Sequence, residues 1–153
     1  MNALDLLKKE HAAVGALLDD VQACEAGDER LDALAKSIEQ ALTVHAKMEE
    51  QLFYPKLRDA AGKGEEKTDV FEAYTEHDVL KHLIALLQRE GRRDEAFKAE
   101  LQVLGENVKH HVKEEESTIF TLAREKFDDA QLDEIGSDME RFRDEAMAAS
   151  SRA

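Results

Sequence analysis

Six residues that can bind metal ions are arranged as two sets of three, and the residue types follow the same order in each set. In each set a single histidine is followed, after 33 intervening residues, by a His-x-x-x-Glu motif. The six residues are His11, His45 and Glu49 in the first set and His77, His111 and Glu115 in the second. Burying two carboxylates without a compensating cation costs several kcal/mol each. The set therefore predicts a pair of metal ions bound by imidazole nitrogens and carboxylate oxygens.

The two parts of the chain that carry these sets are copies of one unit, related by a shift of 66 residues. Glu10-His11 falls on Glu76-His77, and the segment His45-Ala-Lys-Met-Glu49-Glu50 falls on His111-Val-Lys-Glu-Glu115-Glu116. Apolar residues between the motifs match as well. An internal repeat of this kind predicts two related helical hairpins that close face to face. Residues from both hairpins would then line the pseudo-two-fold axis, which favours a site with two metal centres.

Capping residues and glycines divide the chain into five helices. Asn2, Thr68 and Asp94 are typical N-caps, glycine is typical just after a helix, and Pro55 should bend or tighten the second helix. The expected helices span about 3–27, 28–62, 68–91, 94–126 and 129–147. We expect an all-α, up-down-up-down four-helix bundle over about residues 3–126, with a short fifth helix packed outside it. Residues 1–147 would form one domain, with a frayed tail at 148–153.

The helical period places all four repeated histidines on apolar stripes. At 100° per residue, Glu49 and Glu115 also face inward, one turn after a histidine. His82 lies about 140° from His77 and His110 about 100° from His111, so we exclude both as ligands. Glu50 and Glu116 likewise lie near 140° from their histidines, but the run Glu114-Glu115-Glu116 leaves the fourth-helix ligand open. Counted from the turns, His11 and His45 are level, whereas His77 and His111, on either side of a turn near Arg92, differ by about one helical turn.

The bulk properties exclude several classes of partner. A formal net charge of −14 argues against nucleic acid and anionic membranes, both of which need a basic surface. The chain has no apolar stretch near the roughly 20 residues that a bilayer requires, and its start lacks the order of a signal peptide. We therefore expect a cytoplasmic location. Cys24 is the only cysteine, so a cysteine-based metal cluster is excluded.

The donor set also indicates which metal is bound. Nitrogen and oxygen donors without thiolate suit iron or manganese better than structural zinc. In this order and spacing the motifs resemble those of the hemerythrin family, specifically the hemerythrin-like HHE cation-binding domains, over about residues 3–126. The Leu-Phe-Tyr-Pro segment after Glu49 is part of the resemblance. The resemblance implies two iron ions (Fe2+/Fe3+) with bridging carboxylates, an oxo or hydroxo bridge, and reversible binding of O2 or a similar molecule.

The sequence departs from the respiratory hemerythrins at two places. Those proteins carry His-x-x-x-His in the third helix, and Lys81 stands where the second histidine would fall. Their fourth helix carries His-x4-Asp, where this chain offers either Glu115 or Glu116 after His111. Tyr54, Tyr74 and Lys81 are candidates to complete the site, and Asn107 also reaches the ligand face.

Several functions fit this centre. The first is a non-haem di-iron protein that binds O2, NO or peroxide. The second is a di-iron enzyme that turns over peroxide or NO in stress defence. Iron sensing and a metal-free helical interaction module are further alternatives. We expect a monomer or a homodimer.

Overall fold

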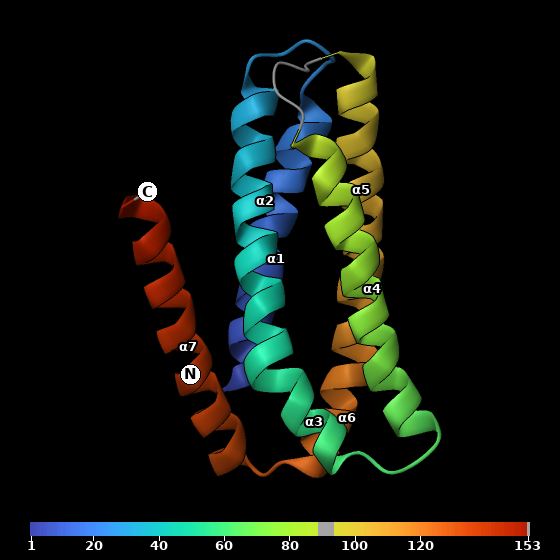
Figure 1. Ribbon diagram of the computed structural model, residues 1–153, viewed down its shortest axis with the longest axis vertical. Helices are drawn as coiled ribbons and strands as arrows, with labels where there is room; N and C mark the ends of the chain where they lie inside the picture. The colour runs from blue at the N-terminus through green and yellow to red at the C-terminus, as the bar shows by residue number, and fades with distance from the viewer. Residues whose placement is uncertain (89–93, 153) are drawn as a thin grey trace.

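The computed structural model describes residues 1–88 and 94–152, and within them every regular element is helical. Four long rods run antiparallel to their neighbours and enclose one core (Figure 1). They consist of α1 (Ala3–Ala23); α2 (Arg30–Met48), η1 (Glu49–Phe53) and α3 (Tyr54–Ala60); α4 (Glu65–Leu87); and α5 (Glu95–Glu114), η2 (Glu115–Ile119) and α6 (Phe120–Lys126). The last helix, α7 (Asp129–Arg152), lies outside the four rods. The predicted all-α bundle with a fifth helix is confirmed.

Two of the three predicted N-caps are present. The Asn2 side chain accepts a hydrogen bond from Leu4 N at 2.8 Å, and Asp94 accepts one from Phe97 N at 2.9 Å. Thr68 is not a cap, because α4 begins at Glu65 and the Thr68 hydroxyl donates to the carbonyl of Gly64 inside the first turn. The first helix ends at Ala23 rather than at Gly27. The predicted helix end at Gly91 and the turn near Arg92 lie outside the described residues.

Each hairpin contains one π-helical segment, and the two segments are equivalent in the repeat. Glu49–Phe53 and Glu115–Ile119 each begin at the glutamate of a His-x-x-x-Glu motif. Pro55 follows the first segment, but Thr121 stands at the equivalent place after the second. Proline is therefore not the shared cause of the π turn. Single π turns inside α-helices are frequent at functional sites.

The hydrophobic core consists of two clusters with a polar layer between them. One cluster contains Leu7, Phe53 and Phe120 near the α3 and α6 end of the bundle, and the other contains Leu18 and Leu104 towards the opposite end. Four buried histidines and two buried glutamates lie between these clusters. Apolar packing on both sides thus fixes the height of the polar layer. Cys24 is buried and has a free thiol.

The fifth helix covers the bundle. Leu132, Ile135 and Met139 are buried in the same cluster as Leu7, and α7 lies against α1 and α2. Gly136 permits this contact, because a Cβ there would overlap the Met1 carbonyl oxygen and lie 2.7 Å from Ala3 N. The helix continues to Arg152, past the boundary expected at 147 and through most of the tail expected to fray. None of the helices in the described segments combines the length and apolarity needed to cross a bilayer.

Candidate metal centre

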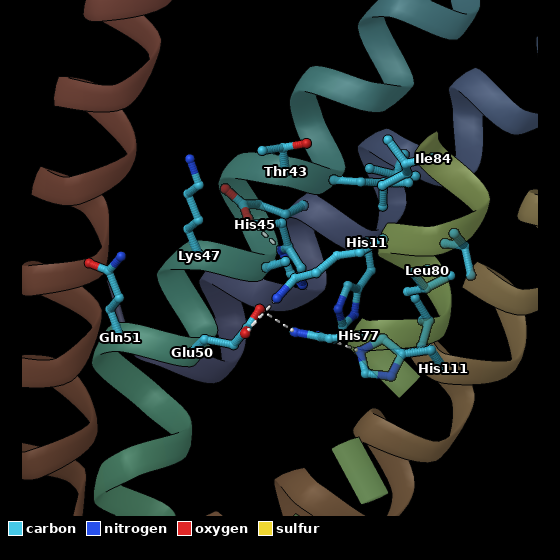
Figure 2. Close-up of a pocket in the computed structure, with 17 residues that line it drawn as sticks. His11, Thr43, His45, Lys47, Glu50, Gln51, His77, Leu80, Ile84 and His111 are labelled. Atoms are coloured by element: carbon cyan, nitrogen blue, oxygen red, sulfur yellow. Dashed lines mark hydrogen bonds and ion pairs between the residues drawn. The ribbon is translucent and has the colours of Figure 1, made fainter. Parts of the chain in front are cut away.

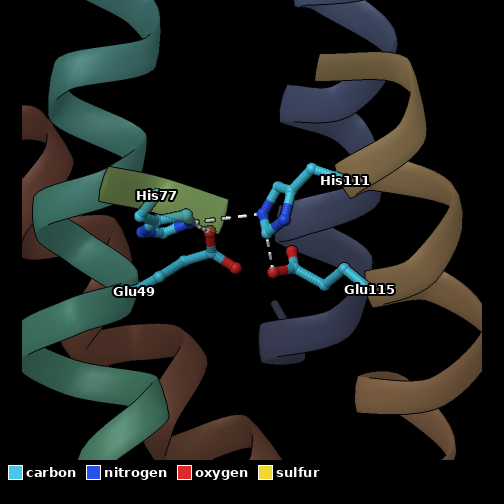
Figure 3. A group of neighbouring side chains, drawn as sticks. All are labelled: Glu49, His77, His111 and Glu115. Atoms are coloured by element: carbon cyan, nitrogen blue, oxygen red, sulfur yellow. Dashed lines mark hydrogen bonds and ion pairs between the residues drawn. The ribbon is translucent and has the colours of Figure 1, made fainter. Parts of the chain in front are cut away.

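The structure brings all six sequence-predicted residues together in the polar layer between the two hydrophobic clusters. Their exposed fractions range from 0% to 8%, so all six are buried. Figure 3 shows four of them pointing toward one another: Glu49 and His77 from two different rods, and His111 and Glu115 from a third. His82 and His110, which the helical period excluded, are exposed. The expected mismatch in height between His77 and His111 is absent, since their Nε2 atoms lie 3.2 Å apart.

Each buried glutamate lies between histidines of the two hairpins. The Oε1 atom of Glu49 is 2.8 Å from Nε2 of His45 and 3.2 Å from Nε2 of His77. Glu115 is the counterpart of Glu49 in the repeat. Its Oε1 is 3.1 Å from Nε2 of His11, and its Oε2 is 3.3 Å from Nε2 of His111. Both carboxylates are therefore placed to bridge between the hairpins.

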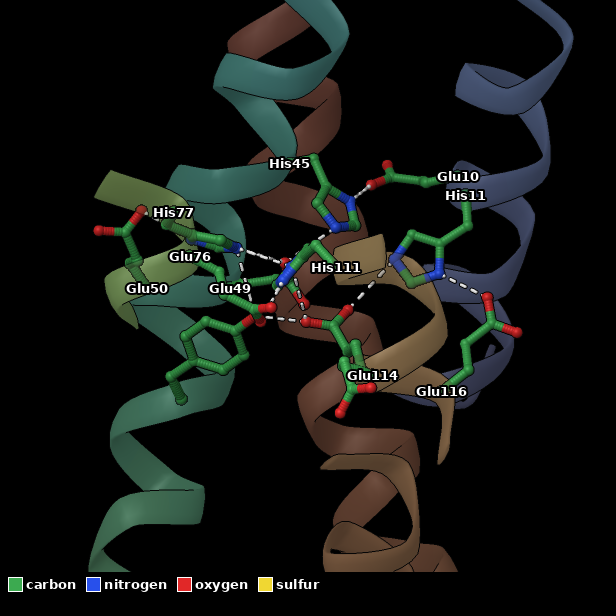
Figure 4. Close-up of polar contacts among 12 residues, drawn as sticks. Glu10, His11, His45, Glu49, Glu50, Glu76, His77, His111, Glu114 and Glu116 are labelled. Atoms are coloured by element: carbon green, nitrogen blue, oxygen red, sulfur yellow. Dashed lines mark hydrogen bonds and ion pairs between the residues drawn. The ribbon is translucent and has the colours of Figure 1, made fainter. Parts of the chain in front are cut away.

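Four further glutamates hold the histidines from outside (Figure 4). In every case a carboxylate oxygen faces Nδ1 of a histidine on another rod. The pairs are Glu10 with His45 at 2.7 Å, Glu76 with His111 at 2.9 Å, Glu116 with His11 at 2.8 Å and Glu50 with His77 at 3.1 Å. An ionised carboxylate only accepts hydrogen bonds, so Nδ1 carries the hydrogen. The Nε2 atoms are thereby directed inward, as in histidines that bind metals.

Sequence reasoning missed this outer set. The helical period does not predict a role for Glu50 or Glu116 outside the centre, because on an ideal helix they point about 140° away from the preceding histidine. They do point away from it, and their long side chains reach a different histidine on a neighbouring rod. The available signal was the repeat itself, since all four outer glutamates recur at the shift of 66 residues directly beside predicted ligands.

Several inward-facing atoms of the site are buried without a hydrogen bond. Among the described residues this is true of Nε2 of His11 and His45, both carboxylate oxygens of Glu49 and Oε1 of Glu115. The short distances above join some of these atoms at angles that do not form hydrogen bonds. Leaving a buried polar atom unpaired costs about 1–3 kcal/mol, so a concentration of them at one place needs an explanation. A cation between these atoms would satisfy them.

The same donor atoms form two overlapping groups that could each hold a metal ion. One group consists of Glu49, His77, His111 and Glu115, and the other of His11, His45 and Glu115. Glu115 belongs to both groups. The arrangement therefore fits two neighbouring cations that share a carboxylate.

The electrostatics of the site are dominated by pairs of opposite charge. Burial lowers the pKa of His45, but the Glu49, Glu10 and Glu115 carboxylates together outweigh it, and the pKa is raised well above its usual value. Burial also lowers the pKa of His111, but hydrogen bonds with neighbouring carboxylates raise it to about 10. Burial and two nearby carboxylates raise the pKa of Tyr54 well above its usual value, so its phenol stays neutral and can donate. The buried carboxylates thus favour positive charge beside them.

The two halves of the site differ at one aromatic position. The hydroxyl of Tyr54 donates to Oε2 of Glu115 and lies 3.2 Å from Nε2 of His77. The counterpart of Tyr54 in the repeat is Phe120, whose ring stacks on His11 with centroids 6.1 Å apart. A phenol is therefore present on the His77 side, and a phenyl ring takes its place on the His11 side.

The other candidates left open by the sequence are now placed. Glu115 faces the site, and Glu116 holds His11 from outside. Tyr74 packs edge-on against Tyr54, with ring centroids 5.2 Å apart. Lys81 donates to Oε1 of Glu50 at 2.8 Å rather than reaching the centre. Asn107 donates to the carbonyl oxygen of Val103.

An apolar pocket of about 420 Å³ adjoins the site and is lined by all four histidines. In Figure 2 His77 and His111 lie at one end of the pocket and Ile84 at the other. Leu42, Leu80 and Val108 also line it. A small molecule can therefore be held beside the buried imidazoles in largely apolar surroundings.

The fold and the site define a helical-bundle protein with a metal-binding site in its core. The chain belongs to the hemerythrin family, because the hemerythrin HHE cation-binding domain matches residues 2–123. The resemblance recognised in the sequence is thereby confirmed. A crystal structure of an HHE cation-binding domain protein from Mycobacterium kansasii, a homologue of Rv2633c, superposes with a TM-score of 0.84. The superposition covers 99% of this chain and 91% of that one at 22% identity, which supports the fold.

Two curated relatives are similar in sequence. The uncharacterized protein Rv2633c of Mycobacterium tuberculosis is 28% identical over 140 residues, covering 91% of this chain and 83% of that protein. A DNA nickase of Nostoc sp. is 29% identical over 135 residues. The match covers 88% of this chain but 37% of the nickase, so this chain corresponds to a part of that protein.

Proposed function

We propose that this chain binds two iron ions at the six buried residues, and that the centre binds O2 or a related small molecule such as NO or peroxide. The observation that supports this most directly is the set of buried, unpartnered donor atoms of His11, His45, Glu49 and Glu115. Their donor types suit iron or manganese. The oxo or hydroxo bridge stays a prediction from the family resemblance.

The histidines would divide between the two ions by hairpin, and the two glutamates would be shared. His11 and His45 would hold one ion, His77 and His111 the other, and Glu115 would contact both. Glu49 would also contact both, since it lies within 3.2 Å of His45 and His77. When bound, the iron pair would supply redox chemistry and coordination positions for a small molecule.

The remaining residues hold the imidazoles in place and line the pocket beside the centre. The outer glutamates fix the orientation of the imidazoles, as partners of metal-bound histidines generally do. The apolar pocket favours small uncharged molecules over ions, because charge is costly to transfer from water. Binding and release of O2 or NO require no other catalytic group.

A second candidate, an enzyme that turns over peroxide, is favoured by Tyr54. Its neutral phenol is a buried hydrogen-bond donor 3.2 Å from Nε2 of His77, and it could donate a hydrogen bond to peroxide at this place. Phe120 on the other side has no such group. Reduction of peroxide to water consumes protons, so a buried phenol beside the centre favours this candidate.

Metal analysis tests the proposal. The protein is loaded with Fe2+ without oxygen, freed of loose metal on a desalting column, and analysed for iron per chain. We expect two iron ions, one for each donor group. His77→Ala and His111→Ala should each lose iron, whereas the exposed control His82→Ala should retain it. Less than about 0.2 iron per chain in the unaltered protein, or equal retention in all three variants, would overturn the proposal.

Spectra of the loaded protein separate binding from turnover. An oxygenated spectrum that reverses on removal of O2 supports the binding protein. Repeated consumption of peroxide that falls in Tyr54→Phe supports the enzyme. Azide and NO provide further ligands for the same measurement.

We also propose a cytoplasmic location, a monomer or homodimer, and no binding to nucleic acid or membranes.

A further inference from the structure

A second, smaller pocket reaches the site between α1 and α5. This seam, the line of contact between two neighbouring helices, lies on the opposite side of the bundle from the α2/α4 seam. The pocket has a volume of about 220 Å³ and is lined by His11, Leu18, Val108 and Val112 among others. His11, Val108 and Val112 also line the larger pocket. The two pockets therefore adjoin the same histidine and are separated by shared side chains.

The smaller pocket is the repeat counterpart of one side of the larger pocket. Each of its eight lining residues corresponds, at the shift of 66, to a residue that lines the larger pocket between α2 and α4. His11 corresponds to His77, Leu18 to Ile84 and Glu116 to Glu50. The pseudo-two-fold symmetry thus provides an opening at each of two seams.

The two openings differ at five of the eight counterpart positions, and the largest change in side-chain size is between Lys81 and Gly15. At the α2/α4 seam Lys81 stands on the rim and donates to Glu50 at 2.8 Å. Its counterpart at the α1/α5 seam is Gly15. The side chain that spans one opening is therefore missing from the other.

Neither the backbone conformation nor the packing requires glycine at position 15. Gly15 lies inside α1, where glycine destabilises a helix relative to alanine. Its φ is not positive, and a Cβ added there would meet no atom within 4 Å. Gly105 on α5 is different, because a Cβ there would lie 3.2 Å from Leu18 Cδ2. Because Gly15 has no side chain, open space remains beside the pocket.

We propose that the α1/α5 pocket is a second entrance to the centre, which binds small uncharged molecules of the O2 and NO class and is kept open by the absence of a side chain at Gly15. The apolar lining suits such molecules, and the volume of about 220 Å³ is sufficient for them. Delivery to iron rests on the function proposed above. Occupancy of the pocket does not, because its walls are protein side chains.

Xenon tests the pocket independently of iron, since this gas binds in apolar cavities. Crystals of the full chain, both iron-loaded and metal-free, are placed under xenon pressure. We expect xenon in both pockets of the unaltered protein. In Gly15→Leu the α1/α5 xenon should be lost and the α2/α4 xenon retained. Lys81→Leu, which places the same side chain at the counterpart position, is the matched control and should keep the α1/α5 xenon.

Two results would overturn the proposal: no xenon in the α1/α5 pocket of the unaltered protein, or xenon retained there in Gly15→Leu. If Gly15→Leu does not fold, the unaltered protein and the smaller change Gly15→Val give the same decision. In the iron-loaded protein, NO should bind more slowly to Gly15→Leu than to Lys81→Leu. A protein that binds xenon at Gly15 but no iron would contradict the proposed function and leave the pocket intact.

Discussion

Every histidine of the centre is held by a glutamate from a different rod of the bundle. Glu10 on α1 holds His45 on α2, and Glu76 on α4 holds His111 on α5. These two contacts are equivalent in the repeat. Beyond them the halves differ, because Arg143 of α7 lies 3.9 Å from Glu10 whereas His110 lies 3.6 Å from Glu76. The orientation of each imidazole thus depends on a neighbouring rod.

Removing an outer glutamate should weaken metal binding without removing a ligand. We expect Glu10→Ala and Glu76→Ala each to lower iron affinity by about 10–100-fold, because the imidazole loses the partner that fixes it. Competition with a chelator of known affinity measures this. Glu106→Ala, an exposed change on α5, is the control. Unchanged affinity in both variants would show that the outer carboxylates do not support the site.

The phenol of Tyr54 should matter most when the protein is metal-free. In Tyr54→Phe the buried Oε2 of Glu115 loses a hydrogen-bond donor, which should destabilise the metal-free protein by about 1–3 kcal/mol. Unfolding in urea measures the difference. Tyr74→Phe, at a half-buried ring, should have a much smaller effect. Equal effects of the two changes would show that the contact with Glu115 contributes no stability.

At the scale of elements, α7 depends on close approach of two backbones. Gly136→Ala places a Cβ against the Met1 carbonyl, so we expect α7 to shift and the protein to lose about 1–3 kcal/mol. Gly15→Ala makes the same change inside another helix but meets no atom within 4 Å, and it should be neutral or stabilising by up to about 1 kcal/mol. Thermal unfolding compares the two. Similar effects of both changes would contradict this account of α7.

Most of the fold was predictable from sequence. The apolar stripes around His11 and His77 correctly predicted that these ligands lie in the core. An amphipathic helix in a bundle buries its apolar face, which fixes the direction in which residues on that face point. The π segments were not predictable, because a helical period of 100° per residue contains no π turn and neither motif has a local signal for one. A constant helical period therefore does not distinguish Tyr54 from Tyr74 and Lys81 as the residue that reaches the centre. The outer contacts of Glu50 and Glu116 depend on the spacing of rods, which one helix does not encode.

At the scale of the whole molecule, the site joins the two hairpins. Glu49 of one hairpin contacts His77 of the other, and Glu115 contacts His11 in return. A polar layer between two hydrophobic clusters is costly unless its charges are compensated. Metal binding should therefore stabilise the entire bundle rather than one helix.

Iron should raise the midpoint of thermal unfolding. With free iron at 100 times the dissociation constant, one site contributes about 2.7 kcal/mol, which corresponds to roughly 5–10 °C for a domain of this size. Calorimetry with and without iron, in the absence of oxygen, measures the shift. His77→Ala should show a smaller shift. A midpoint that does not change with iron would mean that the folded protein does not bind it preferentially.

The central claim concerns where the metals lie, and anomalous diffraction at the iron edge from crystals of the loaded protein tests it most directly. We predict two peaks in the polar layer, one beside His11 and His45 and one beside His77 and His111, with Glu115 next to both. A single peak, or peaks on the exposed acidic surface with none between these histidines, would contradict the account.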